Sequence, residues 1–350
     1  MKNGDNTKSR KPLKVICVII SVLLFTVIVL CCILELYPML HDRTEYDGTL
    51  ESASHWMADI DDDKLLSDIS IPGVHDAAAD ECQLRLLAKC QDKGIRKLLE
   101  DGYRYLDVRL GIEKIDGKDN LTFYHGFLHC LNGKFPWSRH LTFEDVVQEC
   151  GEFLKENPTE TILFVVKQEH GSEDIIEFAG LLNTMIENSE TRGQWLLTDR
   201  IPTLGEARGK IVLFRRYEDR ALLGEKSGIY IDWGKQDNKP EGEQSKSFAK
   251  EQKETFNLMI QDRYKYDAET KWKVFLDTVN VGNTEKAAED VMINFLSSNG
   301  TMAYGHPYAL AEKLNKRLLD LEKDTVLPGW TILDFCDARL ADVIIRSNEK

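Results

Sequence analysis

The segment Ser70–Asp80, SIPGVHDAAAD, contains a transition from strand to helix that decides how the rest of the sequence is interpreted. An apolar run ends at Pro72-Gly73, and His75 and Asp76 follow before small residues that indicate the start of a helix. Proline and glycine interrupt regular structure and are frequent in turns. We therefore predict a strand that ends at Pro72-Gly73 and a turn that presents an ionisable pair.

Strand-like and helix-like segments alternate from this point to the end of the chain. Most strand candidates are continuous apolar runs rich in Val, Ile, Phe and Tyr, as in parallel strands that are buried on both faces. The candidates are residues 65–71, 103–110, 121–128, 160–168, 209–217, 256–264, 291–298 and 329–336. Between two of them, an apolar stripe predicts a helix with Thr142 as N-cap and Asp145 in a near capping box.

This alternation predicts an α/β protein with a distorted (β/α) TIM-type barrel, preceded by one N-terminal transmembrane helix. A doubly wound open sheet is the alternative, but no Gly-x-Gly-x-x-Gly pattern follows the first strand.

The N-terminal part of the chain differs in composition from the rest. The run Val15–Leu34, VICVIISVLLFTVIVLCCIL, has no charged residue and is about as long as a helix that crosses a bilayer. Lys and Arg residues precede it, which predicts that the N-terminus is cytoplasmic. We expect a single-pass protein of the cell membrane with its catalytic domain extracellular. The predicted parts are a cytoplasmic basic tail over 1–14, a transmembrane signal-anchor over 15–36, a linker over 37–60 and a catalytic barrel over 61–350. Secretion after signal cleavage is the alternative, although no Ala-x-Ala site ends the run.

The charge and the cysteines restrict the partners of the protein. A formal net charge of −14 argues against nucleic acid as a partner. The sequence contains no Cys-x-x-Cys motif and no Cys/His spacing typical of a zinc site. An extracellular location would permit Cys82–Cys90 or Cys130–Cys150 disulfides, and small buried thiols are the alternative.

Almost every predicted strand ends in an ionisable side chain. In a barrel of this type the carboxyl ends of the strands form one rim, where the chemistry takes place. The residues at these ends are His75, Asp76, Asp107, Arg109, His125, Lys167, Glu169, Arg215, Arg216, Asp262, Tyr264 and Asp334. A barrel built only for stability would need no such rim, so we interpret these residues as a candidate site.

Two histidines, an arginine and carboxylates are suited to acid–base cleavage of a phosphodiester. A hydroxyl on the substrate next to the phosphate would serve as the nucleophile, and no Gly-x-Ser-x-Gly motif supplies one from the protein. A divalent ion at Asp107-Val108-Arg109 would require a second carboxylate at position 109. Arginine stands there instead, so we expect neither a metal nor another cofactor.

The residues around this rim resemble those of the bacterial phosphatidylinositol-specific phospholipases C, the X-domain family. The similarity extends over about residues 64–345, in the order of the family. It rests on the segments SIPGVHDA, GYRYLDVRL, FYHGFL, PTETILFVVKQE, ARGKIVLFRRY, IQDRYKY, GHPYALA and WTILDF. The family fold is a distorted, incompletely closed barrel. Val74 and Ala77 depart from the Thr and Ser that are frequent in the family.

The resemblance implies a role for each matching residue. His75 would be the general base for the inositol 2-hydroxyl, oriented by Asp334, and His125 the general acid, assisted by Asp76. Arg109 would bind the phosphate and be held by Asp107. The residues matching inositol contacts are Lys167, Arg216, Asp262 and, as an aromatic platform, Tyr264, although Arg215 beside Arg216 leaves open which arginine reaches the ligand.

The implied activity is that of a metal-independent phosphatidylinositol diacylglycerol-lyase, which forms diacylglycerol and inositol 1,2-cyclic phosphate. The expected partner is phosphatidylinositol or a glycosylated inositol lipid in a membrane. One alternative is a metal-dependent glycerophosphodiester phosphodiesterase-like barrel, which would require an acidic residue in place of Arg109. Another is an inactive surface module that binds inositol lipids or glycans. Phe135-Pro136-Trp137 either inserts into the membrane as an apolar tip or folds onto the domain.

Overall fold

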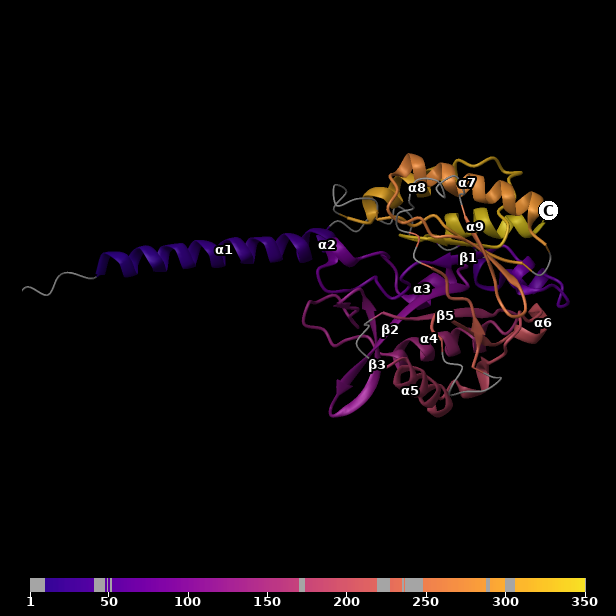
Figure 1. Ribbon diagram of the computed structural model, residues 1–350, viewed down its shortest axis with the longest axis horizontal. Helices are drawn as coiled ribbons and strands as arrows, with labels where there is room; N and C mark the ends of the chain where they lie inside the picture. The colour runs from indigo at the N-terminus through magenta and orange to yellow at the C-terminus, as the bar shows by residue number, and fades with distance from the viewer. Residues whose placement is uncertain are drawn as a thin grey trace, which may run out of the picture.

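Figure 1 shows the chain as a computed structural model, which describes residues 10–40, 48, 50, 52–169, 174–218, 227–234, 236, 248–287, 290–299 and 306–349. Most of the predicted basic tail therefore lies outside the described residues. A long helix projects from an α/β domain, and the sheet of that domain lies between two groups of helices.

The described residues form one sheet of twelve strands with a parallel centre. Its hydrogen-bonded order is β6-β7-β5-β2-β1-β12-β11-β10-β9, and the seven strands from β7 to β10 are parallel. β6 and β8 both pair parallel with β7, and β9 pairs antiparallel with β10. No ladder between described residues joins the two ends of this sheet, so the α/β fold is TIM-barrel-like and open on one side. The strands are β1 Ile71–Val74, β2 Tyr105–Ile115, β3 Lys118–His125, β4 Leu128–His129, β5 Ile162–Gln168, β6 Trp195–Leu196, β7 Ile211–Arg215, β8 Ile229–Tyr230, β9 Ala249–Gln252, β10 Asn257–Gln261, β11 Val291–Phe295 and β12 Trp330–Leu333.

Helices cover the outer face of the sheet, on both sides of the strands in Figure 1. The α-helices are α1 Arg10–Leu40, α2 Arg85–Ala88, α3 Ile95–Glu100, α4 Phe143–Glu156, α5 Ile175–Asn188, α6 Leu204–Ala207, α7 Ala268–Glu285, α8 Tyr308–Leu319 and α9 Ala338–Ile345. The short 3₁₀ helices are η1 Ala53–Asp59, η2 Leu66–Asp68, η3 Arg192–Gln194 and η5 Arg346–Glu349. η1 lies within the predicted linker, and its Trp56 is buried against the barrel core.

The parallel strands are mostly apolar because both of their faces are buried. In β5, Phe164 and Val166 belong to the core between sheet and helices, whereas Leu163 and Val165 belong to the core inside the barrel. Successive side chains of a strand point to opposite faces, so a strand between two apolar layers shows no polar alternation.

The predicted N-terminus of α4 is confirmed. Thr142 is its N-cap and accepts a hydrogen bond from the backbone N–H of Asp145, whose side chain accepts one from the backbone N–H of Thr142. The two residues thus satisfy each other's free donors at the helix start.

The prediction that Pro72-Gly73 end the first strand is wrong, because both residues lie inside β1. A Cβ atom at Gly73 would lie 2.3 Å from Cδ1 of Ile332, so the Ile332 side chain packs over Gly73 in space that a larger residue would fill. The strand ends one residue later, at Val74, and the chain turns at Asp76, which has a φ of 42°.

The prediction that residues 121–128 form one more barrel strand is also wrong. β3 pairs antiparallel with an extension of β2, and the pair Ile115–Lys118 leaves Asp116 and Gly117 as a two-residue turn. Both turn residues have positive φ, and Asp-Gly is a strong sequence indication of a hairpin. His125 therefore reaches the rim from a hairpin that folds back along β2.

The first helix has the dimensions of a membrane span. Within α1, the segment Lys14–Glu35 has 22 residues, and its most apolar 18-residue window has a mean hydropathy of 3.3 and is not buried in the protein. A core helix of a soluble domain would be buried, whereas a membrane anchor and a signal sequence both fit this pattern.

Candidate active site

A cavity of about 450 Å³ opens at the carboxyl ends of the parallel strands. Eight of the ten residues to which the resemblance assigns a role line it: His75, Arg109, His125, Lys167, Arg216, Asp262, Tyr264 and Asp334. The other two, Asp76 and Asp107, lie behind Arg109 with side chains 1% and 0% exposed. Parallel strands bring their carboxyl ends to one edge, and this places residues from distant segments around one cavity.

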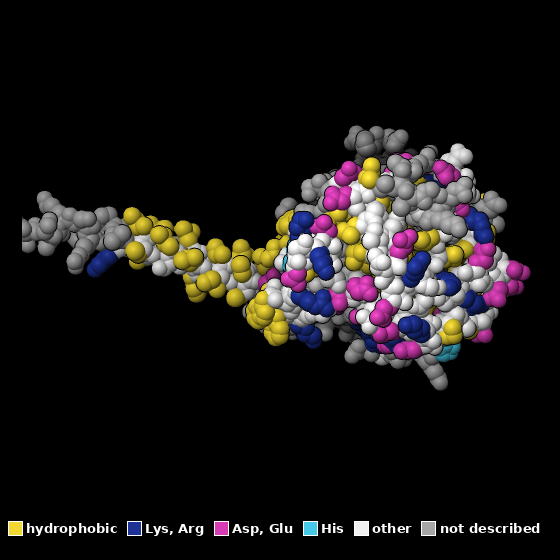
Figure 2. Space-filling model, turned by 90° about the horizontal axis from the view of Figure 1, so that it is seen from below, with side chains coloured by type: hydrophobic (Ala, Val, Ile, Leu, Met, Phe, Trp, Pro, Cys, Tyr) yellow, Lys and Arg dark blue, Asp and Glu magenta, His cyan; other side chains and the backbone are white. Residues whose placement is uncertain are grey.

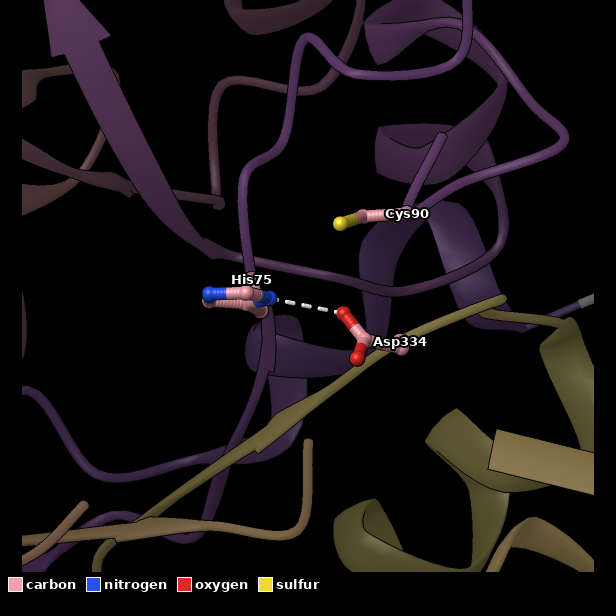
Figure 3. A group of neighbouring side chains, drawn as sticks. All are labelled: His75, Cys90 and Asp334. Atoms are coloured by element: carbon pink, nitrogen blue, oxygen red, sulfur yellow. Dashed lines mark hydrogen bonds and ion pairs between the residues drawn. The ribbon is translucent and has the colours of Figure 1, made fainter. Parts of the chain in front are cut away.

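His75 and Asp334 form a direct pair in this cavity, as the resemblance implies. His75 follows β1, Asp334 follows the neighbouring strand β12, and His75 Nδ1 lies 2.7 Å from Asp334 Oδ1 (Figure 3). The backbone N–H of His75 also donates to the carbonyl of Leu333 at 2.9 Å. This geometry fixes the ring and directs Nε2 away from Asp334.

Asp76 contacts both histidines and the arginine rather than His125 alone. Its Oδ2 lies 3.3 Å from His125 Nε2 and 3.4 Å from His75 Nε2, and its Oδ1 forms an ion pair with Nε of Arg109. The backbone at Asp76 is left-handed, and the side chain points inward to His75, His125 and Arg109. The predicted pairing of Asp76 with His125 is therefore one of three contacts.

Arg109 lies between three carboxylates. In addition to Asp76, it contacts Asp107 at 3.5 Å and Glu169 at 3.1 Å, and its NH2 atom lies 2.9 Å from His75 Nε2. Burial alone would lower the pKa of Arg109, but Asp76, Asp107 and Glu169 outweigh it and raise the pKa well above its ordinary value. The guanidinium is thus a permanent positive charge at the centre of the site.

Glu169 is one of the rim residues identified from the sequence, but no role was predicted for it. It bonds Arg109 and Lys167 and accepts the backbone N–H of Gly126, the residue after His125, at 3.1 Å. Burial would raise its pKa, but Arg109 and Lys167 lower it to about 2. Lys167 and Glu169 are two residues apart at the end of β5, and this spacing was the available indication that they share a face.

The far side of the cavity combines one arginine, one carboxylate and an indole ring. The guanidinium carbon of Arg216 lies 3.5 Å from the ring centre of Trp233, whose Nε1 donates to Asp262 Oδ2 at 3.0 Å. Arg215 instead donates to backbone carbonyls, including that of Gly228, and does not line the cavity. Arg216 is therefore the arginine of the pair that faces the cavity.

Two opposing effects act on the proton of His75. Burial lowers its pKa, but Asp76 and Asp334 stabilise the imidazolium and raise the pKa to about 9, against a smaller opposing effect of Arg109. The neutral ring, with Nδ1–H donating to Asp334, is the form in which Nε2 accepts from Arg109. The neutral, base form of His75 is consequently the minor form below pH 9 and increases as the pH rises through about 9.

Donor atoms that could hold a metal ion occur in and near the cavity. One group comprises His75, Asp76 and Asp107, whose ligand atoms lie within 4.8 Å of one another, but Arg109 pairs with both of these carboxylates. Away from the lining of the cavity, Glu113, His129 and His140 form another such group.

The five cysteines of the domain are buried free thiols. The pairs considered from the sequence, Cys82–Cys90 and Cys130–Cys150, are not formed, and Cys82 instead faces Cys130 in an isolated antiparallel bridge. Cys90 lines the cavity near His75 and Asp334 (Figure 3), and burial raises its pKa well above its ordinary value. This thiol therefore stays protonated and is a poor nucleophile.

A TIM-barrel-like rim with paired histidines, a half-buried arginine and carboxylates defines a class of phosphodiester-cleaving site. Residues 65–217 match the sequence model of the family described as "Phosphatidylinositol-specific phospholipase C, X domain". This match agrees with the resemblance seen in the sequence.

Bacterial relatives match most of the chain. A 1-phosphatidylinositol phosphodiesterase of Listeria monocytogenes is 28% identical over 309 residues, which are 85% of this chain and 86% of that protein. One from Staphylococcus aureus is 26% identical over 310 residues, 84% of this chain and 92% of the relative. The solved structure of a phosphatidylinositol-specific phospholipase C of S. aureus superposes with a TM-score of 0.68 at 22% identity, over 85% of this chain and 97% of the other. That structure supports the fold.

Proposed function

We propose that this chain is a phosphatidylinositol-specific phospholipase C that acts as a diacylglycerol-lyase. The inositol 2-hydroxyl attacks the phosphorus, and the products are diacylglycerol and inositol 1,2-cyclic phosphate. The observation that carries this proposal is the cluster in which Asp76 lies within 3.4 Å of both His75 and His125 and is paired with Arg109. The bacterial relatives are curated as 1-phosphatidylinositol phosphodiesterases, which supports the same substrate.

Each of the clustered groups has a task in this reaction. Neutral His75 takes the proton of the 2-hydroxyl on Nε2 while Asp334 holds Nδ1–H, and the imidazolium of His125 gives a proton to the diacylglycerol oxygen. Arg109 donates to the phosphoryl oxygens as their charge grows. In the free protein Arg109 also contacts Nε2 of His75, so binding of the phosphate draws the guanidinium away and frees the base.

The proposed reaction requires no metal ion. The guanidinium of Arg109 occupies the space between Asp76, Asp107 and Glu169, where a divalent cation would need these same carboxylates. A fixed positive charge there supplies the electrostatic stabilisation that a metal ion would otherwise supply. The inositol ring lies against Lys167, Arg216, Asp262 and Tyr264, which line the remaining part of the cavity.

The proposal includes the placement of the domain in the cell. Residues 15–36 act as a signal-anchor after a basic tail at 1–14, and the barrel over 61–350 follows a linker and lies outside the membrane. The apolar segment Lys14–Glu35 supports this arrangement by its length and exposure.

Incubation with phosphatidylinositol vesicles, with detection of cyclic inositol phosphate by ³¹P NMR, tests the proposal. We expect His75→Ala and His125→Ala each to lower the rate by roughly 10²–10⁴-fold, the usual contribution of a general acid or base. EDTA should leave the wild-type rate unchanged.

The same assay separates the alternatives. Release of a non-cyclic product together with loss of activity in EDTA would indicate a metal-dependent glycerophosphodiesterase. Binding of the vesicles without any product would indicate an inactive lipid-binding module.

A further inference from the structure

A buried arginine joins the membrane-type helix to the rim of the cavity. Arg85, the first residue of α2, is 0% exposed, and its NH1 atom lies 2.9 Å from Glu35 Oε2. Its Nε and NH2 atoms donate to Glu81, and NH2 also donates to the carbonyl of Lys134 at 2.5 Å. The backbone N–H of Leu84 donates to the other oxygen of Glu35 at 2.6 Å. Three segments that are distant in the sequence are thus bonded through one guanidinium.

The position of Glu35 relates this junction to the bilayer. Glu35 is the last residue of the apolar segment Lys14–Glu35, which is about 33 Å long at 1.5 Å per residue. That length spans the hydrocarbon core, so Glu35 lies at the level of the lipid headgroups when the helix crosses a membrane. Because Glu35 is bonded to Arg85, α2 lies at the same level.

The surface beside this junction is apolar. Outside α1, five large hydrophobic side chains of the described residues are exposed, and four of them lie on α2, on the turn after His125, or on the segment that follows Lys134: Leu87, Phe127, Phe135 and Trp137. Phe135 and Trp137 stack with ring centres 5.1 Å apart, and Trp137 is 80% exposed. Figure 2 shows hydrophobic side chains continuing from α1 onto the adjoining surface of the domain.

The cavity opens next to this apolar surface. Leu87, which is 50% exposed, also lines the cavity, two residues after Arg85. Phe127 follows the candidate acid His125 by two residues. Apolar and aromatic side chains at such a rim partition into the boundary between headgroups and acyl chains.

We propose that the Glu35–Arg85 pair orients the domain so that the cavity faces the bilayer that α1 spans, and that the protein cleaves inositol lipids of this same leaflet. The proposal rests on the proposed function for its substrate and on the anchor for its membrane. The tether raises the local concentration of substrate, and the pair sets the angle at which the cavity meets it.

The experiment uses the full chain reconstituted into vesicles. Phosphatidylinositol is placed either in the same vesicles or in separate vesicles mixed with protein-bearing ones, and a water-soluble inositol phosphodiester reports the chemistry alone. We expect the rate with lipid in the same vesicles to be at least tenfold above that with separate vesicles. Glu35→Ala should lower this rate at least fivefold and leave the rate with the soluble substrate unchanged. Glu156→Ala, which removes an acid paired with Arg96 on the exposed surface, is the matched control.

A second measurement does not depend on activity. Brominated lipids should quench the fluorescence of Trp137, measured as the difference between wild type and Trp137→Phe, and the quenching should fall in Glu35→Ala. Equal lipid cleavage by Glu35→Ala and Glu156→Ala, or no quenching that depends on Trp137, would overturn the proposal. Absence of turnover of the soluble substrate by the wild type would instead overturn the proposed function.

Discussion

Replacement of Asp334 by Asn tests how the carboxylates control the proton of His75. Asp334 Oδ1 lies 2.7 Å from His75 Nδ1, and together with Asp76 it raises the pKa of His75 to about 9 from an ordinary value of 6.5. An amide at position 334 removes the negative charge and one hydrogen bond to the imidazolium. The pKa of His75 must therefore fall, because Asp76 alone remains to oppose the effect of burial.

The size of the effect follows from the wild-type value. A pKa about 2.5 above the ordinary one corresponds to roughly 3 kcal/mol of extra stabilisation of the imidazolium, at 1.36 kcal/mol per pKa unit. A close opposite charge typically accounts for about 1–3 units. We expect the acidic limb of kcat/KM, which lies near pH 9 in the wild type, to move down by about 1–2 pH units in Asp334→Asn. The maximal rate should also fall, because the ring is less well oriented.

The assay is the pH dependence of kcat/KM on a soluble inositol phosphodiester. Asp262→Asn is the matched control, because it removes a carboxylate that lines the same cavity and is bonded to Trp233 rather than to His75.

The free energy of unfolding provides a second readout. A raised folded-state pKa stabilises the fold fully below pH 6.5, and this stabilisation is lost as the pH rises through about 9. The free energy of unfolding of Asp334→Asn should therefore fall less than that of the wild type as the pH rises through this range. A limb that stays near its wild-type pH in Asp334→Asn would refute the assignment of His75 as the base controlled by Asp334.

Three further predictions concern the supporting structure. Arg104→Met should cost about 3–5 kcal/mol in urea unfolding, because it leaves Glu160, which like Arg104 is 0% exposed, as an unpaired buried charge. Trp233→Phe keeps an aromatic ring but loses the hydrogen bond to Asp262, so KM should rise roughly threefold to tenfold with little change in kcat. Thr142→Ala removes the N-cap of α4 and should destabilise the domain by about 1 kcal/mol.

Each of these predictions has an outcome that contradicts it. The double variant Arg104→Met with Glu160→Gln should recover part of the lost stability, and no recovery would count against a buried-charge effect. A fall in kcat without a change in KM for Trp233→Phe would show that the ring acts on the chemical step. Thr142→Ser keeps the capping oxygen, and equal destabilisation by Ser and Ala would rule out the cap as the cause.

Much of the fold and of the site could be predicted because local patterns carry the information. Continuous apolar runs indicated the buried parallel strands, and the spacing around Thr142 indicated α4. The site residues could be found because most of them lie where the parallel pairing of a strand ends or just after it, and parallel strands end at one rim. The hairpin β2–β3 is also encoded locally, by Asp116-Gly117, although residues 121–128 were predicted to form one more barrel strand.

Other features of the site depend on contacts that no local pattern specifies. Glu169 resembles any other acid at a strand end until the fold places it against Arg109 and Gly126. Trp233 lies in an irregular segment, and only packing brings its ring to Arg216. The neighbouring arginines Arg215 and Arg216 differ for the same reason. Arg215 donates hydrogen bonds to backbone carbonyls, whereas Arg216 faces the cavity.

The sequence by itself determined the kind of elements, the apolar helix at the N-terminus and the set of chemical groups available at the rim. These properties follow from residue periodicity and from the chemistry of single side chains, both of which are local. The tertiary structure decided the partners. His75 and Asp334 are 259 positions apart and meet at 2.7 Å only because β1 and β12 are neighbours in parallel register. Likewise, Asp76 serves two histidines and one arginine because the turn after β1 and the hairpin β3 converge on it. Strand order and register set these distances, and they result from the packing of the whole domain.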